Sequence, residues 1–146
     1  LNHVVAEAIE QLRADLAGVE LSRHERELPA VKIHREGIRS VVTNLLSNAR
    51  DATGCDGRVR VETAVENGHV MLSVSDNGCG MTPDYIANDL FRPFRSTKSK
   101  GLGIGMFQCR MIVEAHRGNI AVDSKPGEGT TFRISLPHSN RPLGRP

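Results

Sequence analysis

Three polar side chains share one side of a segment whose other side is apolar. Asn44, Asn48 and Asp51 are spaced i, i+4 and i+7, so on a helix they form one row. Amide and carboxylate oxygens are the ligands that Mg²⁺ prefers, and Mg²⁺ usually keeps waters while contacting phosphate. The row therefore indicates a magnesium–phosphate site, although polar residues at the edge of an amphipathic helix would also explain it.

A second group follows a predicted strand directly. It is the segment Asp76-Asn77-Gly78-Cys79-Gly80, which comes after the alternating residues 70–75. A carboxylate at the end of a strand can accept a hydrogen bond from an amine such as adenine N6, and glycines let the backbone approach a flat ring. Because Asp-Asn-Gly forms turns in many proteins, the segment alone indicates either a base site or a turn.

A glycine-rich segment leads into a predicted helix. In Gly101-Leu102-Gly103-Ile104-Gly105, backbone N–H groups and the helix dipole would favour phosphate. The absence of a preceding strand and of a following Gly-Lys-Ser/Thr excludes dinucleotide-binding and Walker A motifs. Arg92, Arg95, Lys98 and Lys100 precede it. A solvated basic loop would explain them, but beside such a helix start they also suit a triphosphate.

The elements that must position these groups follow from the hydrophobic pattern. Apolar residues at helical spacing predict helices over 3–17, 34–53 and 102–116. In the last helix we expect Ile104, Phe107, Met111 and Ile112 to face inward. Gly54 should end the middle helix.

Alternation of apolar and polar residues predicts strands over 58–65, 70–75, 119–124 and 130–136, with a further short strand at 28–33. Asn67-Gly68 and Pro126-Gly127 should form hairpin turns. The long irregular segment 77–105, with a weak helix start at Thr82, is expected to be functional. Hairpins with helices gathered on one face predict an α+β fold, a two-layer α/β sandwich. We expect one domain over 1–137 and a disordered tail over 138–146.

Composition excludes several classes of protein. A chain of 146 residues suits one domain, and no apolar run approaches the ~18 residues of a membrane span. A net charge of +2 and 3% aromatic residues argue against a nucleic-acid partner. Cys55, Cys79 and Cys109 form neither a disulfide framework nor a zinc motif, which favours a cytoplasmic location. The first residue is Leu1, not Met, which suggests part of a longer protein.

Together these segments resemble the ATP-binding catalytic domain of two-component sensor histidine kinases, in the GHKL superfamily with its Bergerat fold. Asn44–Ala49 resembles the N box, Asp76–Gly80 the G1 box, Phe91–Phe94 the F box, and Gly101–Gly105 the G2 box. The segment 127–132 resembles the last hairpin of the family. The resemblance covers residues 1–137 and implies a mixed sheet, helices on one face and a mobile ATP lid over about 88–101.

The resemblance also implies a role for each matching residue. Asn48 would hold Mg²⁺, Asn44 would lie near the γ-phosphate, and Lys98 and Arg92 would neutralise phosphate charge. Asp76 would bind adenine N6 with support from Thr130 through a water. The remaining residues would shape the base pocket or enclose the phosphates: Gly78, Gly80, Gly101, Leu102, Gly103, Ile104 and Gly105. Many relatives carry Lys, Arg or Tyr at Asp51, which either binds a Mg²⁺-coordinated water or interacts with Arg50.

The implied reaction is transfer of the γ-phosphate of ATP to a histidine. Hydrolysing members of the superfamily carry a Glu at position 44 to activate water, whereas Asn44 favours transfer to an external nucleophile. Neither His3-Val4 nor His24-Glu25 matches the acceptor motif. The acceptor is therefore expected on a dimerisation domain outside this chain, with a response regulator downstream. The alternatives are an anti-sigma-factor-like serine kinase, an ATP-driven conformational clamp and a nucleotide-binding pseudokinase.

Overall fold

The computed structural model describes residues 1–53, 56–92 and 105–138. One five-stranded sheet has the strand order β1-β2-β3-β5-β4. The strands are β1 (Glu20–His24), β2 (Arg58–Glu66), β3 (His69–Asp76), β4 (Asn119–Lys125) and β5 (Gly129–Pro137). β1 is parallel to β2 and the other pairs are antiparallel. The sheet is therefore mixed, as expected.

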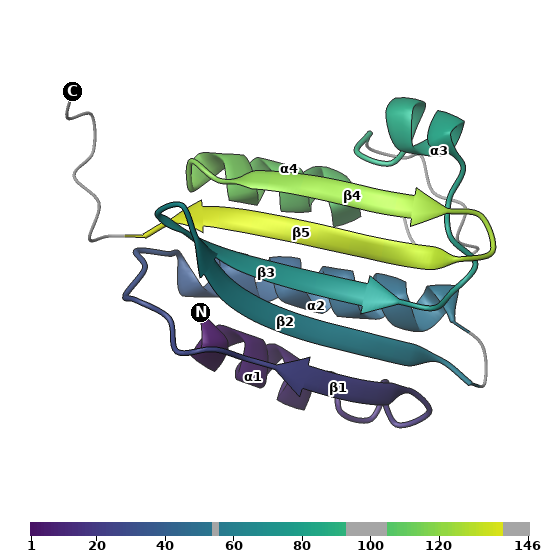
Figure 1. Ribbon diagram of the computed structural model, residues 1–146, viewed down its shortest axis with the longest axis horizontal. Helices are drawn as coiled ribbons and strands as arrows, with labels where there is room; N and C mark the ends of the chain where they lie inside the picture. The colour runs from purple at the N-terminus through teal and green to yellow at the C-terminus, as the bar shows by residue number, and fades with distance from the viewer. Residues whose placement is uncertain (54–55, 93–104, 139–146) are drawn as a thin grey trace.

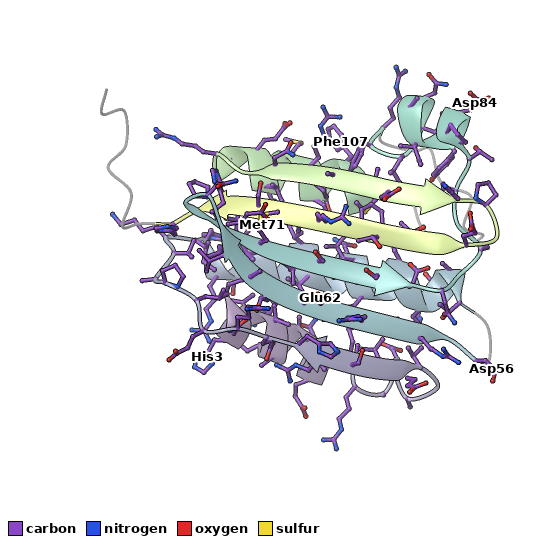
Figure 2. All side chains as sticks on the ribbon, viewed as in Figure 1. His3, Asp56, Glu62, Met71, Asp84 and Phe107 are labelled. Carbon is purple, nitrogen blue, oxygen red and sulfur yellow. The ribbon has the colours of Figure 1, made fainter. Side chains whose placement is uncertain are left out.

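In the described residues, the helices that pack on this sheet lie against one face, and Figure 1 shows α1, α2 and α4 behind it. The helices are α1 (Asn2–Gln11), α2 (Arg35–Ala52), α3 (Pro83–Asn88) and α4 (Gly105–Ala115). The opposite face carries side chains such as those of Glu62 and Met71, which Figure 2 shows on the side turned to the viewer. The predicted two-layer α/β sandwich is confirmed. No helix in the described part of the chain is long and apolar enough to span a membrane.

Helix α2 forms the centre of the helical layer. Its buried residues recur at helical spacing and are Ile38, Val41, Val42, Leu45, Leu46 and Ala49, which confirms the predicted stripe. His34 caps the helix, because its Nδ1 accepts a hydrogen bond from Gly37 N at 3.0 Å. This apolar stripe packs against the sheet, so the polar row at 44, 48 and 51 lies along one side of the helix.

The two predicted hairpins are present. Asn67 and Gly68 both have positive φ, 51° and 78°, which is the geometry of a tight hairpin turn between twisted strands. In the second hairpin, the register pairs Ser124 with Thr130, and β5 also pairs with β3 so that Thr130 lies beside Asp76. The C-terminal end of β3 and the start of β5 therefore lie side by side at one end of the strands.

Three details of the sequence prediction are wrong. The strand predicted at 28–33 is irregular, and the first strand is instead Glu20–His24, where only Leu21 is partly buried. Pro29 has no N–H to donate to a sheet, whereas the polar β1 lacks the alternation that would have revealed it. The first helix ends at Gln11 rather than 17, and turns follow it.

The third error concerns the inward face of α4. This helix buries Met106, Cys109 and Val113, and the expected Ile112 packs partly buried against the core, whereas Met111 is 55% exposed. Apolar residues occur almost all around α4, so periodicity alone did not define one face. The predictions for Gly54, Ile104 and the tail 139–146 lie outside the described residues.

Candidate nucleotide-binding site

The N-box amides lie against the first turns of α4. A Cβ atom placed on Gly105 would lie 3.1 Å from Asn44 Oδ1. Asn48 Nδ2 donates to Met106 Sδ at 3.0 Å, a weak hydrogen bond because thioether sulfur is a poor acceptor. The side chain of Asn44 also hydrogen bonds to the Cys109 thiol, whose pKa burial raises to about 12. Thus the predicted amide row and the last glycine of the G2 box lie side by side.

Asp76 lies at the end of β3, on the face of the sheet that carries the helices. It continues the alternation of the buried residues Val70, Leu72 and Val74. Its Oδ1 accepts a hydrogen bond from Gly78 N at 2.8 Å. Burial raises the pKa of Asp76, while the backbone N–H groups of Gly78 and Thr130 lower it by a smaller amount. The carboxylate is therefore held partly out of water by backbone donors.

The Asp76 loop, residues 77–82 between β3 and α3, packs on the C-terminal end of α2. Cys79 N donates to Ala52 O at 2.9 Å, and a Cβ atom on Gly78 would lie 2.4 Å from the same oxygen. Because Ala52 is one helical turn beyond Asn48, α2 links the Asp76 loop to the amide row. The loop that follows Asp76 is consequently attached, through Cys79, to the end of the helix that carries Asn48.

Gly80 has a φ of +71°, and a Cβ atom there would lie 1.9 Å from Lys125 O. Only glycine fits such close backbone contact in a left-handed conformation. Gly127 N, in the turn between β4 and β5, donates to Cys79 O at 2.7 Å. The Asp76 loop is therefore held between the end of α2 and the β4–β5 turn.

Thr130 is buried, with 6% of its surface exposed, and it pairs with Asp76 across the sheet. Its hydroxyl lies 2.7 Å from Ser124 Oγ. Ser124 was not among the predicted site residues. Its place beside Thr130 follows from the hairpin register, which could have been deduced once the turn at Pro126-Gly127 was assigned.

Asp51 and Arg92 lie at the margins of this arrangement. Asp51 accepts hydrogen bonds from Arg50 Nε at 3.1 Å and Nη2 at 2.7 Å, so one of its two predicted interactions is present. Arg92 is exposed and follows Phe91, which lies 5.4 Å beneath the Arg110 guanidinium of α4. This cation–π contact attaches the first F-box residue to α4. Lys98, Gly101, Leu102 and Gly103 lie outside the described residues, as does Ile104.

A separate hollow of about 270 Å³ lies at the β1–β2–β3 end of the sheet. Its lining includes Arg58, Arg60 and Ser75 as well as Asp76, but none of the N-box amides. The described residues contain no cluster of His, Cys, Asp or Glu that could hold a metal. Amide oxygens such as that of Asn48 are among the oxygen ligands that Mg²⁺ accepts.

In this arrangement the amides of α2 lie beside the start of α4, and the loop that follows the strand-end carboxylate Asp76 packs on the end of α2. The model of the histidine kinase-, DNA gyrase B- and HSP90-like ATPase family matches residues 33–140. Since this match covers most of the chain, the protein belongs to that family. Its relatives and structural neighbours place it with the histidine kinases of the family.

Curated relatives match most of the chain. The signal transduction histidine-protein kinase AtoS of Escherichia coli strain K12 is 34% identical over 143 residues, which cover 94% of this chain and 23% of AtoS. Sporulation kinase E of Bacillus subtilis is 36% identical over 112 residues, covering 76% of this chain and 15% of that kinase. The chain thus spans less than a quarter of the length of these two relatives.

Solved structures share the fold over nearly the whole chain. The catalytic domain of histidine kinase ThkA superposes with a TM-score of 0.84 and 26% identity, covering 94% of this chain and 92% of that domain. The mycobacterial sensor histidine kinase MprB gives a TM-score of 0.82 and 26% identity, covering 97% and 95%. The resemblance deduced from the sequence motifs is confirmed.

Proposed function

We propose that this domain binds Mg–ATP between α2, α4 and the Asp76 loop, and transfers the γ-phosphate to a histidine on a dimerisation domain outside the chain. The phosphoryl group would then pass to a response regulator. The observation that carries the proposal is the hydrogen bond from Cys79, in the loop after Asp76, to Ala52, one helical turn beyond Asn48 on α2. A carboxylate and a row of amides so placed can bind opposite ends of one nucleotide.

The residues present suit such a ligand. The Asp76 carboxylate would accept a hydrogen bond from the adenine amine, and Thr130 would support it through a water. Gly78 and Gly80 let the loop after Asp76 pack closely on Ala52 and Lys125, which would shape the base pocket. Gly105 begins a helix whose positive end suits phosphate. Asn48 would hold Mg²⁺, with Asn44 near the γ-phosphate; the metal would neutralise charge on the phosphates. Arg92, Lys98 and residues 101–104 would supply the remaining phosphate contacts.

Transfer to an external nucleophile is favoured over hydrolysis, because Asn44 stands where a general base would be needed to activate water. The amide side chain of Asn44 has no basic lone pair, so it cannot remove a proton from water. It can still orient a phosphate group by hydrogen bonding. AtoS, ThkA and MprB are histidine kinases, and the serine-kinase and clamp alternatives gain no support from them. A cytoplasmic location is part of the proposal.

The adenine assignment is tested by titrating the nucleotide-free domain with ADP and Mg–ATP, comparing the wild type with Asp76→Asn. The variant replaces an acceptor by a group that can present a donor to the adenine amine, so we expect loss of binding by at least about tenfold. Asp123→Asn is the matched control, because Asp123 is exposed on β4. Equal affinities for Asp76→Asn and wild type would contradict the proposed site.

Phosphotransfer is tested by adding Mg–ATP and a separately prepared dimerisation domain of a sensor kinase to the wild-type chain. We expect label on the added domain that is lost in acid and stable in base, as phosphohistidine is. Acid-stable label would identify a serine kinase instead. Release of inorganic phosphate without labelled protein would identify an ATPase of the clamp type.

A further inference from the structure

The β4–β5 hairpin contacts the Asp76 loop through a polar side chain that the mechanism above does not use. Ser124 Oγ accepts a hydrogen bond from Met81 N at 2.8 Å, donates to Gly129 O at 3.0 Å and lies 2.7 Å from Thr130 Oγ1. Met81 belongs to the loop that follows Gly80, whereas Gly129 and Thr130 begin β5. One hydroxyl therefore connects both sides of the proposed base pocket.

Donor and acceptor counting fixes the direction of these bonds. A hydroxyl has one proton and two lone pairs. The Met81 N–H can only donate and the Gly129 carbonyl can only accept, so they use one lone pair and the proton of Ser124. The second lone pair of Ser124 is left for the proton of Thr130. With its proton used in this way, the Thr130 hydroxyl presents only lone pairs to the pocket.

The direction of the Thr130 hydroxyl proton matters because Thr130 lies beside Asp76. It pairs with Asp76 across β3 and β5, and both side chains are on the helix-facing side of the sheet. Two neighbouring acceptors, a carboxylate and a hydroxyl without a spare proton, favour a partner that brings donor protons. An adenine amine and a water molecule do so. A carbonyl at the same ring position, as in hypoxanthine or guanine, brings an acceptor and is disfavoured.

We propose that Ser124 is a positioning residue for base selection, because it holds the Thr130 hydroxyl as an acceptor toward the base pocket. The inference rests on the proposed function, since it takes the Asp76 pocket to bind the base. In the Ser124→Ala variant the Thr130 proton loses its partner and can turn into the pocket. There it would donate to a base carbonyl and compete for the Asp76 carboxylate.

The test is the ratio of dissociation constants for inosine diphosphate and adenosine diphosphate, measured by titration of the folded chain. The base of inosine diphosphate carries a carbonyl where adenine carries the amine. We expect Ser124→Ala to reduce this ratio by about three- to tenfold. A merely structural role would weaken both nucleotides equally and leave the ratio unchanged, which would overturn the inference.

Three further variants serve as controls for the role of the Ser124 hydroxyl. Ser124→Thr retains the hydroxyl and should restore the wild-type ratio. Ser135→Ala, on the opposite face and at the other end of the hairpin, should leave it unchanged. Thr130→Val removes the hydroxyl that Ser124 directs, so adding Ser124→Ala to Thr130→Val should change the ratio no further. If Ser124→Ala changes the ratio as much in the Thr130→Val background as in the wild type, Ser124 does not act through the Thr130 hydroxyl.

The two proposals fail in different ways. If Asp76→Asn binds ADP like the wild type, the nucleotide site itself is wrong. If Asp76→Asn loses binding while Ser124→Ala keeps the wild-type ratio, the proposed function stands and only the role of Ser124 is wrong.

Discussion

At the scale of single residues, the carboxylate of Asp76 is held partly out of water at a cost in stability. Burial raises its pKa, and the N–H groups of Gly78 and Thr130 compensate only in part. The described residues that contact it supply backbone amides rather than a cation. Such a group is better suited to a ligand that brings a donor than to the nucleotide-free fold, and perturbed carboxyls of this kind are common in functional sites.

This cost has a definite pH dependence. A carboxyl whose pKa is higher in the folded than in the unfolded state binds its proton more tightly when folded, so this group's contribution to stability falls as the pH rises through both values. Asp76→Asn removes the titration. We therefore expect the free energy of unfolding of the variant, relative to the wild type, to increase from about pH 4 to pH 7.

Urea unfolding of the nucleotide-free domain at several pH values measures this difference. Asp123→Asn again serves as the control, because no comparable burial affects that exposed residue. A difference between Asp76→Asn and wild type that decreases toward neutral pH would show that Asp76 is stabilised, not penalised, in the folded domain.

At the scale of elements, helix α2 depends on its first turn for a defined start. His34 Nδ1 caps the helix through Gly37 N, and the backbone N of His34 donates to His116 Nε2 at 2.8 Å, at the end of α4. His34→Ala removes the cap but keeps the backbone bond to His116. We expect it to lower the free energy of unfolding by about 1 kcal/mol.

His34→Asp supplies another capping acceptor and should retain the stability of the wild type. Urea unfolding midpoints at constant m-value report both variants. Equal losses for Ala and Asp would mean that the His34 ring acts through packing rather than through the cap.

The close packing of the Asp76 loop on the β4–β5 turn predicts different stability costs for alanine at Gly80 and at Gly127. Gly80 and Gly127 both have positive φ, 71° and 79°, but only a Cβ atom on Gly80 meets backbone, at 1.9 Å from Lys125 O. Gly127→Ala should therefore cost only about 1 kcal/mol for its conformation. Gly80→Ala should cost on the order of 3 kcal/mol or more, because the loop must move away from the hairpin.

Thermal unfolding of the two variants measures this contrast. Gly18→Ala, at a position with open space and no positive φ, is the neutral control. Equal destabilisation by Gly80→Ala and Gly127→Ala would show that the close contact between loop and hairpin is absent in solution.

The sequence predicted the elements whose patterns are strong and local. The buried stripe of α2 and the alternation of β2, β3 and β5 reflect complete burial of one face, and Asn67-Gly68 has the chemistry of its turn. β1 was missed because an edge strand with mostly exposed side chains needs no alternation. The inward face of α4 was misassigned because Met111 and the buried Val113 are equally apolar.

The site was predictable only in part, for a related reason. Asp76, Gly80 and the N-box amides belong to motifs within short segments, and each can be recognised by spacing. Ser124 and Arg110 act through partners distant in the sequence, Met81 and Phe91. Their roles depend on sheet register and helix packing, which composition and periodicity do not specify.

At the scale of the whole molecule, one helix joins the two regions to which the proposal assigns the base and the phosphates, which lie far apart in the sequence. Helix α2 carries the amides at its middle and supports the Asp76 loop at its end, while α4 and the β4–β5 hairpin complete the surroundings. A nucleotide bound to both regions would stabilise the layers against each other. At one hundred times its dissociation constant it would add about 2.7 kcal/mol to the free energy of unfolding.

The central claim is that Asp76 and Asn48 contact opposite ends of one nucleotide. The most direct measurement is the change in NMR chemical shifts of the ¹⁵N-labelled domain during titration with Mg²⁺ and a non-hydrolysable ATP analogue. We expect the backbone amides of Gly78 and Thr130, the side-chain amides of Asn44 and Asn48, and the amide of Gly105 to shift with one common dissociation constant. Shifts confined to Arg60, Ser75 and their neighbours around the hollow on the sheet, or different constants for the two groups, would contradict it.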